Sequence, residues 1–168
     1  MIGDHLWLWR ADHGNGVGWT SNTAANGLVV NGNGVTMYGL FVEHYQQHQV
    51  QWNANGGRTY MFQNEMPYDV PNQAGWMNPN GLNGYAAYKV AANVTTHEAW
   101  GLGSYCFFNT NPAVSSYHAF EVPNATGVRF HSVLTVSLNF QGVITHVIND
   151  TGATTPPGTT PSNVVNFP

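Results

Sequence analysis

Two glutamates mark the stretch of the sequence best suited to chemistry. Glu43 ends an apolar run that begins at Val35, and Glu65, 22 residues after Glu43, ends a similar run that begins at Arg58. Each run follows an Asn/Gly turn, so the carboxylates recur at equivalent points of a repeated unit. Stacked units would bring the two carboxyl groups to between hydrogen-bond distance and about 10 Å of one another. Such a pair can supply one protonated acid and one ionised base, as glycoside hydrolysis requires.

Aromatic residues near the same turns favour a sugar ligand over a bare pair of acids. Flat rings stack on the C–H faces of sugars, while Asn, Gln and Asp bond to the hydroxyl groups. The alternatives are that the two glutamates only end strands on a solvated edge, and that the rings cover the flanks of the fold. The rings concerned are Trp52, Tyr60, Tyr68, Trp76, Trp100 and Tyr105.

The repeat also predicts the fold that must position these groups. Self-similarity at a period in the low twenties, carried by short β-rich runs between Asn/Gly turns, is typical of a solenoid of stacked coils. No helical periodicity appears between residues 27 and 65, so we expect an all-β parallel β-helix. Tyr68 to Asn83 is predicted to be a long protruding loop. We assign 1–150 to the β-helix domain and 151–168, rich in Pro and Thr, to a linker or a tail wrapped along the outside.

The charge content excludes several classes of function. Charged residues make up 7% of the chain, against about a quarter in an average protein. With four Lys or Arg and a net charge of −4, the chain lacks a basic stripe for nucleic acid or for an anionic membrane surface. No apolar run is long enough to span a membrane. The low charge together with many Asn and Thr residues favours a secreted bacterial protein.

No metal or cofactor is expected. His44 and His48 would share a face of a helix, but the strand pattern before them argues against a helix there. His13 follows Asp12 and is interpreted as a hydrogen-bonding neighbour of that carboxylate. The single cysteine, Cys106, lies among aromatic residues and is expected to be a buried small apolar residue.

Three segments together resemble one known family. The stretch VEHYQQHQVQWNANGGRTYMFQNEMPYDVP, residues 42–71, is similar to the part of glycoside hydrolase family 55, the β-1,3-glucanases or laminarinases, in which S-E-H is followed about one coil later by Q-T-E-S-P-Y-Y. Residues 6–13, LWLWRADH, resemble that family's L-W-x-W-x-A-D-H segment. Residues 101–108, GLGSYCFF, resemble its G-L-Y-S-x-F-S run. The three segments occur in the family's order.

The resemblance implies both a fold and a reaction. The family consists of two right-handed parallel β-helices of the pectate-lyase type, and this chain resembles the second, catalytic one. Glu65 would be the general acid, and Glu43 the carboxylate that holds and activates water, for inverting hydrolysis of β-1,3-glucan. Combining the resemblance with the aromatic pattern, we expect the substrate to contact Gln63, Tyr68, Gln49, His44, Asp12, His13, Trp52 and Tyr105.

The sequence departs from the family at two positions and leaves other functions open. Met66 stands where the family usually has Ser, and Asp69 replaces its second Tyr. A binding or assembly module without turnover would carry the same coils and aromatic rows, and a hydrolase of another polysaccharide could share the fold. Because coil ends expose unpaired strand edges, we also expect a homo-oligomer that forms through them.

Overall fold

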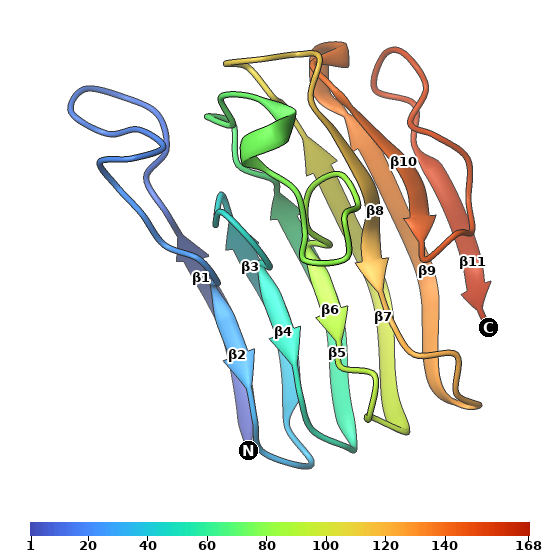
Figure 1. Cartoon of the computed structure of the whole chain (residues 1–168). Coiled ribbons are helices and arrows are strands. Elements are labelled where there is room, and N and C mark those ends of the chain that lie inside the picture. Colours follow the sequence, from blue (N-terminus) through green and yellow to red (C-terminus); the bar gives the residue numbers. More distant parts are fainter.

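The chain winds through successive coils, each of which adds strands to two parallel sheets (Figure 1). The computed structural model describes residues 1–168. The first sheet has six strands in the order β1 (Ile2–Trp9), β3 (Thr36–Glu43), β5 (Gly57–Glu65), β7 (Thr96–Cys106), β9 (Gly127–Ser137) and β11 (Ser162–Phe167). The second sheet has five in the order β10 (Val143–Ile148), β8 (Ser115–Glu121), β6 (Tyr88–Val90), β4 (Val50–Trp52) and β2 (Leu28–Val30).

This topology confirms the predicted parallel β-helix. Every pairing between neighbouring strands is parallel except that of β11 with β9. The helical segments are two 3₁₀ turns, η1 (Gln73–Gly75) and η2 (Leu138–Phe140). The structure contains no helix with the length and apolarity needed to cross a membrane.

The core is built from rows of apolar side chains that stack from coil to coil. Leu40 pairs in register with Phe62, Phe62 with Leu102, and Leu102 with Val133. All four side chains are buried. Because the strands run parallel and in register, equivalent positions of successive coils meet inside the solenoid. Each such side chain contributes about 1.5–3 kcal/mol on burial.

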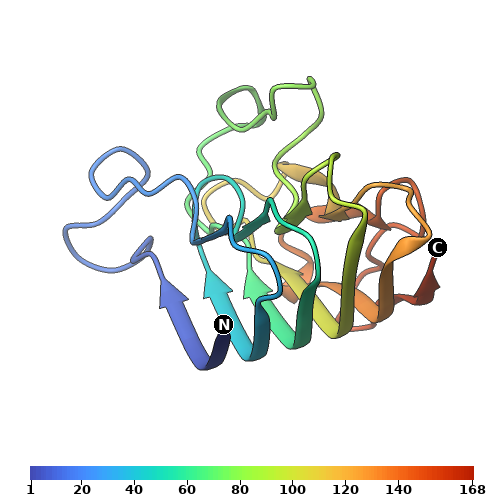
Figure 2. The ribbon, with the colours of Figure 1, turned by 90° about the horizontal axis from the view of Figure 1, so that it is seen from below.

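The strands of the first sheet turn a corner near their middle, and Figure 2 shows the bend in successive ribbons. The residue at this corner has a positive φ in five successive coils: His5 (50°), Gly39 (60°), Met61 (65°), Gly101 (66°) and Ser132 (54°). The left-handed conformation redirects the chain without ending the ladder of strand pairs. The corner divides the outer face into two parts, and both glutamates lie on the part after the bend.

Two long loops leave the C-terminal ends of neighbouring strands. Residues 10–27 follow β1, and residues 66–87 follow β5 and contain η1. Both project from the same side of the coil stack in Figure 2. The second loop confirms the predicted excursion from Tyr68 to Asn83. It is anchored by Trp76, which is buried and whose Nε1 donates to the carbonyl of Gln46 at 2.8 Å.

The last residues of the chain add a strand to the first sheet, in the segment whose composition predicts a linker or a tail wrapped along the outside. Residues 162–167 form β11, which pairs antiparallel with β9. Val164 and Phe167 pack against the core, and the buried Thr155 accepts a hydrogen bond from Ile144 N at 3.0 Å. These contacts hold the Pro/Thr-rich segment to the last coils, so residues 151–168 complete the fold.

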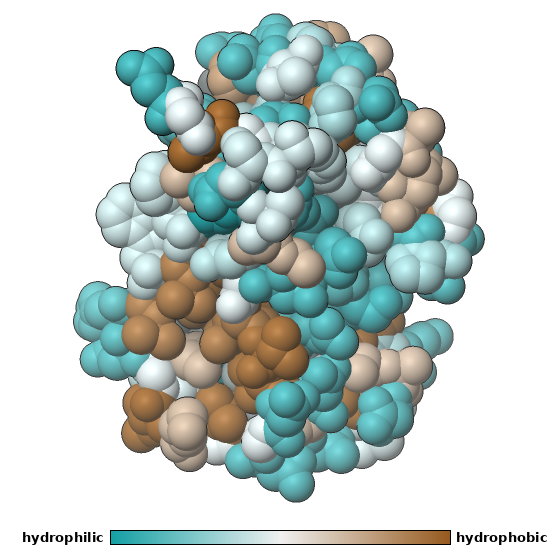
Figure 3. Space-filling view, turned by 60° about the vertical axis from the view of Figure 1, so that its left-hand side comes forward, coloured by the Kyte–Doolittle hydropathy of each residue, from teal (hydrophilic) through white to brown (hydrophobic).

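The other end of the solenoid exposes apolar side chains. Figure 3 shows a patch of hydrophobic residues on the side it presents. The exposed apolar side chains of the first coil are Ile2 and Trp7 of β1 and Val29 of β2. β1 and β2 are the edge strands of their sheets. Association through this coil end stays a prediction.

Candidate active site

Glu43 and Glu65 lie side by side at the ends of neighbouring strands. The register that pairs Phe41 with Gln63 places the two glutamates opposite one another two residues further on. His44 N donates to Glu65 O at 2.9 Å, which continues the ladder past them. Neighbouring strands are about 4.8 Å apart, and both side chains are half-buried on the outer face. The spacing of 22 residues is therefore one full coil.

Glu43 borders an aromatic hollow. Trp7 Nε1 donates to Glu43 Oε2 at 2.8 Å, although the Trp7 side chain is largely exposed. A cavity of about 540 Å³ beside this contact is lined by His5, Leu6, Trp7, Phe41, Glu43 and Gln63. A carboxylate at the edge of an apolar, aromatic hollow suits a sugar ring, whose faces are apolar and whose rim is polar.

Glu65 is held by a tyrosine and faces a histidine. The Tyr68 hydroxyl donates to Glu65 Oε2, and His44 Nε2 lies 3.8 Å from the same oxygen. Burial and the hydrogen bond to Glu65 raise the pKa of Tyr68 far above its usual value, so the phenol stays protonated and remains a donor. Both neighbours of Glu65 therefore approach Oε2, and none of the protein hydrogen bonds engages Oε1.

Behind these groups lies a buried carboxylate, Asp12. Its Oδ2 accepts a hydrogen bond from Tyr68 N at 2.7 Å and lies 3.2 Å from His44 Nδ1, while its Oδ1 lies 2.6 Å from His13 Nδ1. Burial alone would raise the pKa of Asp12, but His44, the Tyr68 N–H and His13 outweigh burial and lower it. Asp12 is thus an ionised group at the centre of the site.

Arg10 connects several parts of the site through hydrogen bonds and an ion pair. This buried arginine donates from Nε to the His44 carbonyl at 2.6 Å and from an Nη to the Asn22 carbonyl at 2.8 Å, and it forms an ion pair with Asp69. Its guanidinium also lies 5.8 Å from the Trp19 ring. Burial raises the pKa of Asp69 despite its partner. Arg10 therefore ties both loops to the backbone of His44.

The structure brings most of the predicted site residues together. Tyr68 and His44 approach Glu65, Asp12 and His13 lie behind them, and Gln63 lines the hollow beside Glu43. Tyr105 pairs in register with Glu65 on β7 and is half-buried. The roles of these residues in binding or catalysis remain predictions.

Two predicted contact residues lie elsewhere. Trp52 is fully buried in the core, where its ring packs against His97 at 4.7 Å, so the prediction that it contacts substrate is wrong. Gln49 is also buried. Its Oε1 accepts from Tyr45 N at 2.9 Å and its Nε2 donates to Tyr45 O at 2.8 Å, so its amide shapes the turn after His44 and does not face a ligand.

Sequence reasoning missed Trp7 and Arg10 as site residues. Both belong to the segment LWLWRADH, which had drawn attention only to Asp12 and His13. Arg10 carried a usable signal, since it is one of four Lys or Arg residues in the chain and follows an apolar strand directly. An arginine in that position has to find a buried partner or leave the core.

The histidines and Asp12 are also the groups best placed to hold a cation. Ligand atoms of Asp12, His13 and His44 lie within 4.8 Å of one another. Each histidine, however, faces a different oxygen of the same carboxylate, so carboxylate–imidazole contacts account for the arrangement. His48 takes no part, because its Nδ1 lies 2.8 Å from the Ala86 carbonyl.

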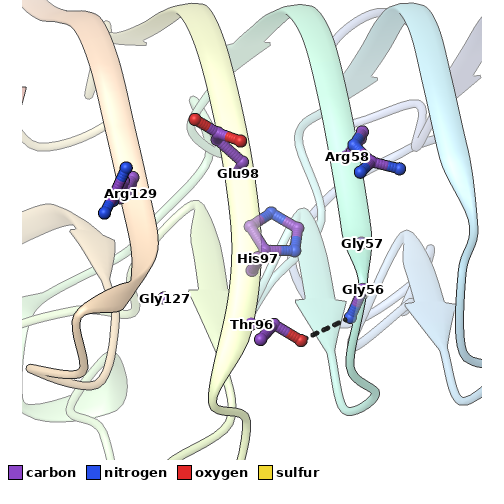
Figure 4. A pocket seen from close by; sticks show the side chains of 8 residues that line it. All are labelled: Gly56, Gly57, Arg58, Thr96, His97, Glu98, Gly127 and Arg129. Atoms are coloured by element: carbon purple, nitrogen blue, oxygen red, sulfur yellow. Dashed lines mark hydrogen bonds between the residues drawn. The ribbon is translucent and has the colours of Figure 1, made fainter.

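A second hollow lies far from the glutamates, at the beginnings of β5, β7 and β9 (Figure 4). Its volume is about 250 Å³. Glu98 pairs in register with Arg58 and Arg129, so the charges alternate along its wall. The two arginines flank the single carboxylate, and the hollow offers no pair of acids.

A separate charged cluster stabilises the second sheet. Glu121 Oε2 lies 3.7 Å from His118 Nε2, and its Oε1 lies 2.8 Å from Lys89 Nζ. These two neighbours outweigh partial burial and lower the pKa of Glu121 to about 2. The cluster lies on β6 and β8, on the opposite sheet from Glu43 and Glu65.

Comparisons with known proteins agree with the fold. A sequence profile described as the LAM55 pectate lyase-like domain matches residues 1–65. An exo-β-1,3-glucanase of Streptomyces sp. (strain SirexAA-E / ActE) is 53% identical over 166 residues, which cover 98% of this chain. This chain spans only 27% of the length of that relative.

Solved structures give the same result. The structure of sacteLam55A from Streptomyces sp. SirexAA-E superposes with a TM-score of 0.96 at 52% identity, over 99% of this chain and 30% of that one. A variant of the same protein in complex with glucose superposes with a TM-score of 0.97 at 52% identity, again over 99% and 30%. These matches confirm the family resemblance and the parallel β-helix.

Proposed function

We propose that this β-helix, which resembles the catalytic one of glycoside hydrolase family 55, hydrolyses β-1,3-glucan through Glu65 and Glu43. The observation that carries the proposal is the placement of these two carboxylates in one outer row, one strand apart, beside an aromatic hollow. The exo-β-1,3-glucanase identity of a relative that matches 98% of the chain supports the linkage. Because such glucans are polymers, we place the activity outside the cell.

The two carboxylates have different roles in the proposed reaction. Glu65 carries a proton on Oε1 and gives it to the glycosidic oxygen as the bond from the anomeric carbon to that oxygen breaks. Glu43, ionised and held by the Trp7 indole, orients a water and takes its proton as the water oxygen bonds to the anomeric carbon. The inverting outcome is the one that the family resemblance implies: water attacks directly, without a covalent intermediate, and the anomeric configuration inverts.

The surrounding residues favour Glu65 as the acid and Glu43 as the base. Tyr68 and His44 crowd Glu65 Oε2, so the oxygen that can carry the catalytic proton is Oε1. Glu43 accepts a single hydrogen bond, from Trp7, so it keeps acceptor capacity for a water. Trp9 flanks the two glutamates on one side and Tyr105 on the other, and both rings are placed to contact neighbouring sugar units.

The proposal is tested by sugar release from laminarin, with cellulose, xylan and an α-glucan as parallel substrates. We expect release from laminarin, a loss of about 10²–10⁴-fold in Glu65→Gln, and unchanged folding and laminarin binding in that variant. Glu98→Gln is a matched control, because Glu98 is a half-buried glutamate on the neighbouring strand and lies far from the site. It is expected to retain activity.

Two results would contradict the proposal. Equal activity of Glu65→Gln and wild type would remove Glu65 from the reaction. A folded protein that binds laminarin but releases no sugar from any of the four glycans would be a binding module. In that event Trp9→Ala and Tyr105→Ala are the changes expected to weaken binding.

A further inference from the structure

Asp12 links the two groups that approach Glu65. Its Oδ2 accepts the Tyr68 N–H at 2.7 Å and lies 3.2 Å from His44 Nδ1. Tyr68 and His44 in turn face the same oxygen, Oε2 of Glu65. We propose that Asp12 and His44 are positioning residues that fix the orientation of the Glu65 carboxyl group. This inference rests on the proposed function, because it assigns these residues a part in the same reaction.

The backbone of His44 is held in a conformation that aims its ring at Glu65. His44 has a φ of 68°, which is uncommon for a residue with a side chain. Its N–H is bonded to Glu65 O and its carbonyl to Arg10 Nε, at 2.9 and 2.6 Å. A conformation of this kind persists only where the surroundings impose it. The cost, of order 1–3 kcal/mol, is balanced by contacts that place the imidazole between two carboxylates.

Ring packing extends the same control to Tyr68. The edge of the His44 ring meets Tyr68 with centroids 4.5 Å apart and planes at 78°, and His13 stacks on Tyr68 at 5.4 Å. Phe107 approaches the Tyr68 ring at 4.9 Å. The phenol is thus fixed by three rings and by its backbone bond to Asp12. Its hydroxyl donates to Glu65 Oε2.

The charged groups around the pair are consistent with a positioning role. Asp12 faces His44, His13 and, at 3.9 Å, Arg10. Asp12 Oδ2 lies 3.2 Å from His44 Nδ1, and His44 Nε2 lies 3.8 Å from Glu65 Oε2, so the imidazole is held between the two carboxyl groups. We expect the Asp12 carboxylate to favour the Nδ1-protonated form of His44. Because Asp12 is buried at the foot of the site, it acts through His44 and Tyr68, and it does not contact substrate.

This arrangement matters most when Glu65 loses its proton. As Oε1–H transfers to the departing sugar oxygen, the electron pair of that O–H bond stays on Glu65 as carboxylate charge. The charge is shared with Oε2, where the Tyr68 hydroxyl donates. Meanwhile the proton of the attacking water passes to Glu43, so the reaction consumes one water, and solvent exchange restores both carboxyl groups. A misaligned Glu65 would slow only the steps that need its proton.

The test compares substrates with poor and good leaving groups. We expect His44→Asn and Asp12→Asn to lower kcat on laminarin by about 10- to 100-fold, as displacements near 1 Å do. Asn is chosen because it tolerates a positive φ. On 2,4-dinitrophenyl β-glucoside, whose leaving group needs no proton, we expect a loss below about threefold. His146→Asn and Asp150→Asn, on or beside β10 in the second sheet, are controls expected to match wild type on both substrates.

An NMR measurement tests the contact between Asp12 and His44 independently of hydrolysis. In protein labelled with ¹⁵N-histidine, wild type should show the Nδ1-protonated form of His44, assigned by its absence from His44→Asn, and Asp12→Asn should lose that preference. An active wild type whose variants lose both substrates equally, or lose neither, would overturn the positioning role and leave the hydrolase standing. A histidine spectrum indifferent to Asp12→Asn would also overturn it. A folded chain that releases no sugar would overturn the proposed function and this inference with it.

Discussion

Replacement of Arg10 by Met should destabilise the protein because it strands a buried carboxylate. Arg10 and Asp69 are both buried, and Asp69 has Arg10 as its cation. Removing one partner of a buried ion pair costs about 3–5 kcal/mol. For a chain of this size, that corresponds to a decrease in Tm of about 6–20 °C. The carbonyls of His44 and Asn22 lose their donor as well, so laminarin hydrolysis should fall together with stability.

The assay is urea unfolding of four proteins, wild type, Arg10→Met, Asp69→Asn and the double variant. The double variant should recover part of the loss, because it no longer buries an unpaired charge. Lys89→Met is the matched control. Its ion pair with Glu121 is about a quarter exposed, at 27% and 25%, and should contribute about 0–1 kcal/mol.

A loss in Arg10→Met no larger than that in Lys89→Met would refute this reasoning. It would mean that the Arg10 pair is solvated and that the two loops are not tied to His44. Strict additivity of the two single changes would contradict the direct contact between Arg10 and Asp69.

Three smaller changes test other parts of the structure. Trp7→Phe keeps the ring but removes the donor to Glu43, so kcat on laminarin should fall about tenfold, equivalent to about 1.4 kcal/mol, with Tm unchanged. Gly101→Ala should lower the free energy of unfolding by about 1–2 kcal/mol in urea, because the φ of 66° is unfavourable for a residue with a side chain. No atom lies within 4 Å of the added methyl group, so no steric clash adds to this cost. The pKa of Glu121 is about 2 in the folded protein against 4.5 for the free group, so its stabilisation, up to about 3 kcal/mol, is complete above pH 4.5 and is lost as pH falls toward 2. In Glu121→Gln the free energy of unfolding should fall less between pH 4.5 and pH 2 than in wild type. An equal decrease in both proteins would contradict the stabilising role of ionised Glu121.

The adjacency of the two glutamates could be predicted because a solenoid converts sequence spacing into distance. The 22 residues from Glu43 to Glu65 are one coil, and strand register then leaves no freedom. Tyr68 is only three residues after Glu65, so its closeness to that carboxyl group follows from the short sequence separation. Local repetition thus determined both the fold and the centre of the site.

The sequence placed two kinds of residue less well: strand residues whose side chains point inward or outward, and residues that meet through loops. Trp52 was expected near substrate, yet in β4 only Gln51 points outward while Val50 and Trp52 are buried. The alternation of apolar and polar residues already carried that information. The pairing of Arg10 with Asp69 had no such signal, since it joins two loops whose contact depends on the whole fold. Composition alone did not predict β11, because a few apolar side chains are enough to attach an edge strand.

The most direct test of the central claim is the anomeric form of the first sugar released from laminarin, followed by ¹H NMR before mutarotation. Hydrolysis by Glu65 as acid and Glu43 as base inverts the β-linkage, so the α-anomer should appear first and the β-anomer should follow only as the two equilibrate. Initial release of the β-anomer would show a retaining reaction with a covalent intermediate. It would contradict the roles assigned here to the two carboxylates.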